Sequence, residues 1–233
     1  MSTILYDKDN SGVVRLTLNR PDKLNAVHLT MRDELWSAFE SFRDDPDARV
    51  LVLRGAGDAF SAGADISDFG TAPSYVEARR ARHERDLWSL LLHMPKPTIA
   101  AVHGYALGAG CEMALLCDLR VAADDARFGL PEVSLGYIPS AGGTQTLPRT
   151  VPPGVALHMI LSGDSIDAQE AWRRKLVQRD QLDAAANEWA VALATRPPLA
   201  LSYAKEAVLR GLDLSLADGL ALETRLAALL RTA

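Results

Sequence analysis

Two short apolar runs separated by a helix-like segment constrain the fold of this chain most strongly. Residues 13–18 read VVRLTL, an alternation typical of a β-strand, and residues 49–54 read RVLVLR, which is apolar enough for a buried strand. The segment between them repeats apolar side chains at helical spacing and ends at Pro46. Thr30, with Asp33 three residues later, is the expected N-cap of this helix. The order of strand, helix and strand predicts a mixed α/β fold.

The same order recurs along the chain, and the second half is almost wholly helical. A helix over about residues 76–92 precedes the expected strand PTIAAV, and after a glycine-rich stretch RVAA predicts another short strand. Beyond Ala141 we expect helices at residues 154–161, 168–177, 183–194, 200–209 and 216–230. Helices that follow strands pack on the sheet or on a neighbouring molecule. We therefore expect an α/β core at residues 1–175 that holds the functional site, and a helical region at 176–233 for oligomerisation or as a lid.

The composition favours one globular domain and disfavours several classes of partner. The chain has 233 residues, 48% of them hydrophobic, enough for a large core. A net charge of −5 and the absence of a sustained Lys/Arg run disfavour nucleic acid. The start MSTILYDKDN has no signal-peptide stretch, and no apolar run approaches the roughly 20 residues that cross a bilayer, so we expect a soluble, cytoplasmic protein without a membrane partner. Cys111 and Cys117 lack metal or disulfide spacing and are expected to be buried thiols.

Two glycine-rich loops can bring backbone amides to a ligand. AFSAGAD, residues 59–65, follows RVLVLR and the turn GAGD, and its small residues let an anion approach the amides; a solvent loop without function is an equal alternative. GYALGAGCE, residues 104–112, places glycines before a helix, where unpaired amides and the helix dipole stabilise an oxyanion. Its spacing matches neither the dinucleotide fingerprint nor the phosphate-binding loop, which argues against a nucleotide.

Two glutamates in apolar surroundings are the candidate acid/base groups. Glu112 lies in a run of Cys, Met, Ala and Leu, where a carboxyl group must be paired, hydrogen-bonded or protonated. Glu132 lies in FGLPEVSLG, and Pro131 stiffens the backbone before it. Each has a structural alternative: Glu112 on the exposed side of an amphipathic helix, and Glu132 as a helix cap. A further glycine-rich segment, IPSAGGTQTLPR, follows and is expected to face the same cleft.

Four blocks of the sequence occur in an order and spacing that a known family shares. They are NRPDKLNA, AFSAGADI, the long block from KPTIAAVHGYALGAGCEMALLC to GYIPSAGGTQTLPR, and LSGDSIDAQEA. These blocks resemble those of the enoyl-CoA hydratase (crotonase) superfamily, and the resemblance runs nearly end to end. Four ordered blocks are far more specific than one glycine loop. The resemblance implies a crotonase-like spiral of ββα units, with C-terminal helices that mediate a homotrimer, commonly stacked as a hexamer.

The resemblance also implies roles for particular residues. The backbone N–H groups of Ala64 and Ala109 would form an oxyanion hole for the thioester carbonyl, while Glu112 and Glu132 would hold and activate water. Substrate binding would involve the N-terminal loop, the path beside the oxyanion hole and the acyl pocket: Lys23, Leu24, Ala26, Ala62, Asp65, Ile66, Leu130 and Ser140. Only Lys23 strongly seeks phosphate, with a solvated surface lysine as the alternative. No metal and no redox cofactor is expected, because coenzyme A is part of the substrate.

Several positions depart from the family pattern. The usual Gly-Gly-Gly is GAG at residues 108–110, and Leu130, Ser140 and Lys175 stand where Gln, Gly and Gly are common. The changes at 130 and 140 are expected to reshape the acyl pocket. The segment after LVQRD is shortened, and the chain ends at LLRTA where family members generally continue, which bears on the oligomer contacts and on the lid over the pocket.

Because both glutamates are present, we expect an enoyl-CoA hydratase, a hydro-lyase of acyl-CoA metabolism that catalyses syn addition of water to a 2-enoyl-CoA. One carboxylate takes a proton from water, another delivers a proton to Cα, and the oxyanion hole stabilises the enolate-like charge. Double-bond isomerisation with Glu132 as the single base is the alternative within the fold, and a non-catalytic acyl-CoA binder is the alternative from another class. The histidines lack metal-ligand pairing and no role is expected for His28, His83, His93, His103 or His158.

Overall fold

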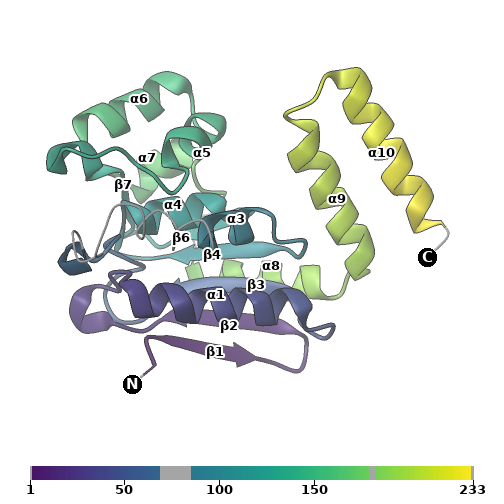
Figure 1. Cartoon of the computed structure of the whole chain (residues 1–233), viewed down its shortest axis with the longest axis horizontal. Coiled ribbons are helices and arrows are strands. Elements are labelled where there is room, and N and C mark those ends of the chain that lie inside the picture. The colour runs from purple at the N-terminus through teal and green to yellow at the C-terminus, as the bar shows by residue number, and fades with distance from the viewer. Residues whose placement is uncertain (1, 69–84, 179–181, 232–233) are drawn as a thin grey trace.

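Two β-sheets organise the chain, of which the computed structural model describes residues 2–68, 85–178 and 182–231 (Figure 1). The larger sheet has the order β1-β2-β3-β4-β6, formed by β1 (Ile4–Lys8), β2 (Val13–Leu18), β3 (Val50–Gly55), β4 (Thr98–Val102) and β6 (Leu119–Ala122). β1 pairs antiparallel with β2, and the other neighbours are parallel. The smaller sheet has the order β5-β7-β8, formed by β5 (Tyr105–Leu107), β7 (Arg127–Gly129) and β8 (Ile166–Asp167). The predicted mixed α/β fold is confirmed.

Both faces of the larger sheet are buried, which explains the nearly continuous apolar run of β3. Leu51 and Leu53 belong to the cluster that packs beneath α1 (Leu29–Asp44), whereas Val50 and Val52 pack with the alanines of α8 (Leu182–Ala194). Successive side chains of a strand point to opposite faces, so helices cover both faces of the sheet. The apolar positions that predicted α1 are all buried in it: Met31, Leu35, Ala38, Phe39 and Phe42.

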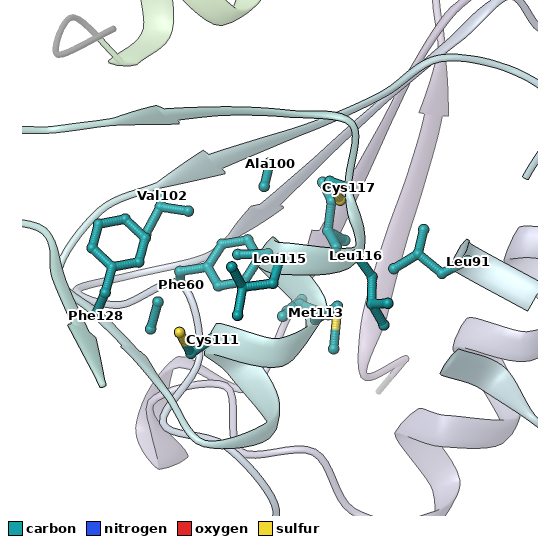
Figure 2. Packing of buried hydrophobic residues seen from close by; sticks show 14 of the residues in the cluster. Phe60, Leu91, Ala100, Val102, Cys111, Met113, Leu115, Leu116, Cys117 and Phe128 are labelled. Atoms are coloured by element: carbon teal, nitrogen blue, oxygen red, sulfur yellow. The ribbon is translucent and has the colours of Figure 1, made fainter. Parts of the chain in front are cut away.

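The short helix α4 (Ala109–Leu116) lies deep in the main core, next to α3 (Leu87–Leu92). Figure 2 shows the packing of this cluster, which includes Phe60, Leu91, Val102, Cys111, Met113, Leu115, Leu116, Cys117 and Phe128. Burial raises the pKa of the thiols of Cys111 and Cys117 to about 12, so both are inert buried thiols, as predicted. A helix buried on nearly all sides holds its N-terminus in a fixed place.

The remaining α-helices of the described residues come after β7 in the chain. They are α5 (Gly143–Thr150), α6 (Pro153–Ser162), α7 (Ala168–Arg173), α9 (Pro198–Gly211) and α10 (Leu216–Leu230). Figure 1 shows α9 and α10 side by side and set apart from the sheets. No residue of α9 is buried, and α10 buries Leu222 and Leu226. In the described parts of the chain, no helix is both long and apolar enough to cross a membrane.

Some predicted boundaries were wrong for local reasons. The N-cap of α1 is His28, whose Nδ1 accepts a hydrogen bond from the N–H of Met31 at 3.3 Å, so Thr30 already lies inside the helix. The helix predicted at 168–177 ends at Arg173, because Lys175 adopts the left-handed conformation with φ of 67°.

Other predicted elements are only partly described. Of the helix predicted at 76–92, residues 76–84 lie outside the described residues, and α3 covers Leu87–Leu92. Strands β1, β5, β7 and β8 were not predicted. The division at residue 175 stays a prediction, and α8, which follows it, packs on the sheet.

Candidate active site

The first glycine loop presents the backbone amide of Ala64. Val27 forms a parallel bridge with Ala64: its N–H donates to the carbonyl of Gly63 at 2.8 Å, and its carbonyl accepts from the N–H of Asp65 at 3.0 Å. In a parallel bridge the central residue directs its own N–H away from its partner. The amide of Ala64, an exposed residue, therefore points away from Val27.

The second glycine loop presents the amide of Ala109. Gly108 immediately precedes α4 with φ 50° and ψ −125°, a conformation that disfavours any residue with a side chain, and Ala109 is the first residue of the helix. The first N–H groups of a helix have no intrahelical acceptor and lie at the positive end of its dipole. The alanine in place of the family's middle glycine leaves this amide intact.

The two loops touch at glycine positions. A β-carbon on Gly63 would lie 2.7 Å from the carbonyl oxygen of Leu107 and 3.4 Å from the amide nitrogen of Ala109. Gly63 is adjacent to Ala64 in sequence, so the structure brings the two predicted oxyanion donors together. This approach depends on the missing side chain, because any β-carbon would push the loops apart.

Glu112 lies one turn into α4 and is 2% exposed, so the alternative of an exposed helix position is wrong. Its Oε1 accepts hydrogen bonds from the N–H groups of Ala141 and Gly143, both at 2.8 Å. A β-carbon on Gly143 would lie 3.0 Å from that oxygen, which explains the glycine there. The third glycine-rich segment thus holds the carboxylate of Glu112 in one orientation.

Glu132 lies in a short 3-10 helix, Pro131–Leu135, and is half-buried. Burial raises the pKa of its carboxyl group above 4.5, and the negative charge of Glu112 raises it further. Its Oε2 is buried and has no hydrogen-bond partner among the described residues. A β-carbon on Gly108 would lie 3.1 Å from its Oε1, while the N–H of Glu112 donates to the carbonyl of Gly108 at 2.9 Å. Both glutamates therefore lie beside the start of α4.

The N-terminal loop is attached directly to Ala64, the first of the two predicted oxyanion donors. Lys23 ends the 3-10 helix Pro21–Lys23 and is exposed, which leaves both phosphate binding and simple solvation possible. Leu24 and Asn25 follow in the left-handed conformation, with φ of 47° and 54°. The carbonyl of Leu24 accepts from the N–H of Ala62 at 2.8 Å. Ala26 precedes Val27, so Leu24, Ala26 and Ala62 line the same junction.

The other predicted substrate contacts differ in exposure. Ile66 is 69% exposed, and Ser140 is exposed beside Ala141. Leu130 is fully buried in the core, so its contact with an acyl chain stays a prediction. The carboxylate of Asp65 is bound to Arg20 and Ser67.

Sequence reasoning missed Arg20, Asn25, Ala141 and Gly143. The Gly-Gly pair before α5 was a signal for the last two, whereas the roles of Arg20 and Asn25 depend on contacts between separate loops. His103 donates from Nε2 to the carbonyl of Gly57 at 2.8 Å, which ties it to a turn and not to the glutamates. Over residues 2–68, 85–178 and 182–231, His, Cys, Asp and Glu side chains form no group of three that could hold a metal ion.

Comparisons with known proteins agree with this geometry. A family model described as enoyl-CoA hydratase/isomerase matches residues 8–231. The chain is 43% identical over 234 residues to the 2,3-dehydroadipyl-CoA hydratase of Escherichia coli, which covers 99% of this chain and 91% of that protein. It is 42% identical over 229 residues to a probable enoyl-CoA hydratase of Mycobacterium bovis, covering 96% and 88%. The crystal structure of an enoyl-CoA hydratase subunit I from Geobacillus kaustophilus superposes with a TM-score of 0.93 at 38% identity, covering 100% of this chain and 91% of that one. The chain therefore belongs to the enoyl-CoA hydratase/isomerase family of the crotonase superfamily.

Proposed function

We propose that this protein is a hydro-lyase that adds water to a 2-enoyl-CoA thioester and releases the 3-hydroxyacyl-CoA. The observation that carries the proposal is the pair of carboxyl groups beside the start of α4. Glu112 is oriented by two amides, and Glu132 has a buried oxygen without a partner among the described residues. The names of the two relatives, a probable enoyl-CoA hydratase and a 2,3-dehydroadipyl-CoA hydratase, each similar over most of the chain, support the same reaction.

In the proposed mechanism, the amides of Ala64 and Ala109 donate to the thioester oxygen and form the oxyanion hole. One carboxylate of the pair accepts a proton from water, the hydroxyl oxygen bonds to Cβ, and the electron pair of the double bond moves toward the thioester oxygen. The other carboxyl group, protonated at the start, then delivers its proton to Cα, and the thioester carbonyl re-forms. Acid/base help of this kind contributes roughly 10² to 10⁴ in rate, and loss of one oxyanion donor costs about 3 to 4 kcal/mol.

No resident metal or redox cofactor enters the proposal, because the thioester itself accepts the developing negative charge and the oxidation state of the substrate does not change. Coenzyme A arrives as part of the substrate. Lys23, exposed at the N-terminal loop, is the cation proposed to meet its phosphates.

The assembly proposed is a homotrimer, or a hexamer of two stacked trimers, formed through the C-terminal helices. The apolar side chains left exposed on α9, on α10 and on the turn between them support it, among them Val208 at 63%, Leu212 at 76% and Leu216 at 81% exposure. Single exposed leucines are common on surfaces, whereas several on one helical hairpin indicate an interface.

Turnover of crotonyl-CoA, followed by loss of its conjugated absorbance, tests the activity. A set of longer, branched, aromatic and dicarboxylic 2-enoyl-CoAs, including 2,3-dehydroadipyl-CoA, would define the acyl group. No turnover of any of them, in a protein that still binds acyl-CoA, would identify a non-catalytic binder instead.

Two single variants separate hydration from isomerisation. Hydration uses both carboxylates, so Glu112→Gln and Glu132→Gln should each lower kcat by roughly 10² to 10⁴. An isomerase that uses Glu132 alone would keep its activity on a 3-enoyl-CoA in Glu112→Gln. Glu223→Gln, an exposed position of α10, is the matched control and should behave as the wild type.

A further inference from the structure

A buried asparagine joins the N-terminal loop to the loop that carries Ala64. Asn25 is fully buried, and its side chain makes three hydrogen bonds. Its Oδ1 accepts from the N–H of Arg20 at 2.8 Å, and its Nδ2 donates to the carbonyls of Ala56 and Ala59 at 2.8 and 2.7 Å. The carbonyl of Asn25 also accepts from the hydroxyl of Ser61 at 2.9 Å. A fully satisfied buried amide of this kind fixes two loops relative to each other.

Arg20 makes a second connection, closer to the oxyanion donor. Its Nη1 donates to the carbonyl of Ala26 at 2.6 Å and to Oδ2 of Asp65 at 2.9 Å. The side chains of this ion pair are only 17% and 14% exposed. The other oxygen of Asp65 accepts from the N–H and hydroxyl of Ser67. Arg20 therefore holds the residue that directly follows Ala64.

The direction of these contacts argues against a direct role of Arg20 in phosphate binding. A cation that binds the phosphates of coenzyme A must present its donors to solvent, as exposed Lys23 does, whereas Nη1 of Arg20 is engaged within the protein. The hydrogen bonds of Ser67, and then that of Arg20, lower the pKa of Asp65 to about 2, so this pair stays charged across the working pH range. Charge-assisted bonds with little exposure are stronger and more directional than neutral ones.

We propose that Arg20, with Asn25 and Asp65, forms a clamp that sets the position of the Ala64 amide, so that Arg20 is a positioning residue for polarisation of the thioester carbonyl. The clamp also links the N-terminal loop, which is proposed to bind coenzyme A, to the proposed oxyanion hole, because the same guanidinium nitrogen of Arg20 donates to Ala26 and to Asp65. This inference rests on the proposed function and deepens it. A shift of about 1 Å in a catalytic donor can cost on the order of 100-fold in rate.

Hydrogen exchange in the protein without ligand tests the clamp directly. In Arg20→Met, the backbone amides of residues 59–66 should exchange at least about tenfold faster, because Asp65 in this loop loses its charge-assisted contact with Arg20. Arg15→Met is the matched control: it removes a similar arginine–aspartate pair, Arg15 to Asp9 at 2.8 Å, and neither partner of Arg15, Asp9 or Asn187, belongs to residues 59–66. It should leave exchange in residues 59–66 unchanged. Equal exchange in the Arg20→Met and wild-type loops would overturn the clamp, whatever reaction the enzyme catalyses.

Carbonyl polarisation is the second readout. The absorbance of 4-(dimethylamino)cinnamoyl-CoA shifts to the red when its carbonyl is polarised, and Arg20→Met should lose about half of this shift or more. Arg20→Lys, which keeps the cation but not the planar fork, is the variant to use if Arg20→Met does not fold, and it should show a smaller loss in the same direction. A full red shift in both variants would contradict the inference.

Kinetics with a shortened substrate separate positioning from binding. Arg20→Met should lower kcat about 10- to 100-fold on both crotonyl-CoA and crotonyl-pantetheine, with little change in KM. Lys23→Ala should instead raise KM for crotonyl-CoA by about 5- to 10-fold and leave the pantetheine thioester unaffected. If Arg20→Met raised KM for crotonyl-CoA alone, Arg20 would be a phosphate ligand and the clamp would be wrong. Failure of the wild type to hydrate any thioester would refute the proposed function only, because the exchange experiment needs no turnover.

Discussion

The sheet core and the α9–α10 hairpin are both rich in apolar side chains, but these side chains are buried in the core and mostly exposed in the hairpin. In β2, β3 and β4, nearly every apolar side chain is buried on one face or the other. In α9 none is buried, and in α10 only two are. An amphipathic stripe predicts that a helix forms, but it does not identify the surface that covers it. The core is therefore complete within the chain, whereas the hairpin presents apolar surface outward.

The same contrast applies to glycine. In the core, glycines mark positions where backbones approach each other, as at Gly63, Gly108 and Gly143. In the hairpin, a β-carbon on Gly211 would have no neighbouring heavy atom within 4 Å. We therefore expect that an added β-carbon is unfavourable at the three core positions and tolerated at Gly211.

Replacement of Gly108 by alanine should have the largest effect. A β-carbon there would approach Oε1 of Glu132 to 3.1 Å, and the backbone has φ of 50° with ψ of −125°. We expect a loss of kcat/KM on the order of 10² or more, because both Glu132 and the Ala109 amide would move. Steady-state kinetics with crotonyl-CoA measure it.

Gly211→Ala is the matched control in the hairpin. It should keep full activity and add about 0.5–1 kcal/mol of stability, since alanine favours a helix more than glycine does. Full activity of Gly108→Ala would show that the close contacts at the start of α4 are not needed.

Core and hairpin should also differ in their response to truncation. Leu53→Ala removes a fully buried side chain of β3 and should lower the free energy of unfolding by about 2–5 kcal/mol. Leu222→Ala, in the hairpin, should cost less, because α9 and α10 pack mainly on each other. Denaturant titration at several protein concentrations measures both. A cost of Leu222→Ala equal to that of Leu53→Ala would mean that the hairpin unfolds together with the core.

The hairpin is attached to the core through Lys205. Its Nζ donates to Oδ2 of Asp118 at 2.7 Å, and the two side chains are 12% and 21% exposed. Lys205→Met should cost about 1–3 kcal/mol, because Asp118 loses a charged partner in a partly buried place. Arg210→Met, which breaks a more exposed pair with Glu206 on the same helix, should cost at most about 1 kcal/mol. Equal costs would show that Lys205 does not anchor α9.

The sequence predicts elements that depend on local patterns better than contacts between residues that are far apart in the chain. The alternation in β2 and β3 and the stripe of α1 are local patterns, and they predicted three elements and the burial of five side chains of α1. The apolar run around Glu112 predicted its burial correctly. Strands of two or three residues, such as β7 and β8, are too short to show a period.

The contacts that complete the site come from distant segments. The amides on Glu112 come from residues 29 and 31 positions away, and Arg20 meets Asp65 across 45 positions. Neither hydrophobic periodicity nor the composition of a loop predicts such contacts between distant residues. The apolar surroundings made both glutamates candidates, and the resemblance to the family added the amides of Ala64 and Ala109, but neither identified the side chains that hold them.

The burial of Glu132 should also cost stability, in a way that depends on pH. Because its pKa is raised in the folded protein, the folded state binds a proton more tightly than the unfolded state, and the ionised group destabilises the fold above that pKa. Glu132→Gln should therefore be more stable than the wild type at pH 7, by about 0.5–2 kcal/mol, and this gain should vanish below about pH 4. Thermal unfolding across pH measures it. Glu223→Gln in the hairpin should show no such dependence on pH. A Glu132→Gln variant less stable than the wild type at pH 7 would contradict the conclusion that burial raises the pKa of Glu132.

The smallest effect is expected where core and C-terminal helices join, at Lys175. Its φ of 67° is left-handed, a conformation that costs a residue with a side chain roughly 1–2 kcal/mol, and many relatives are expected to have glycine there. Glycine also gains conformational freedom in the unfolded chain, and this cancels about 0.5–1 kcal/mol of the stability gained by relieving the strain. Lys175→Gly should thus stabilise the protein by only about 0.5–1 kcal/mol, with no change in kcat. Lys175→Ala separates the causes, because it keeps the strain and should bring no such gain. If both variants were equally stabilised, the lysine side chain and not its backbone would be unfavourable at this position.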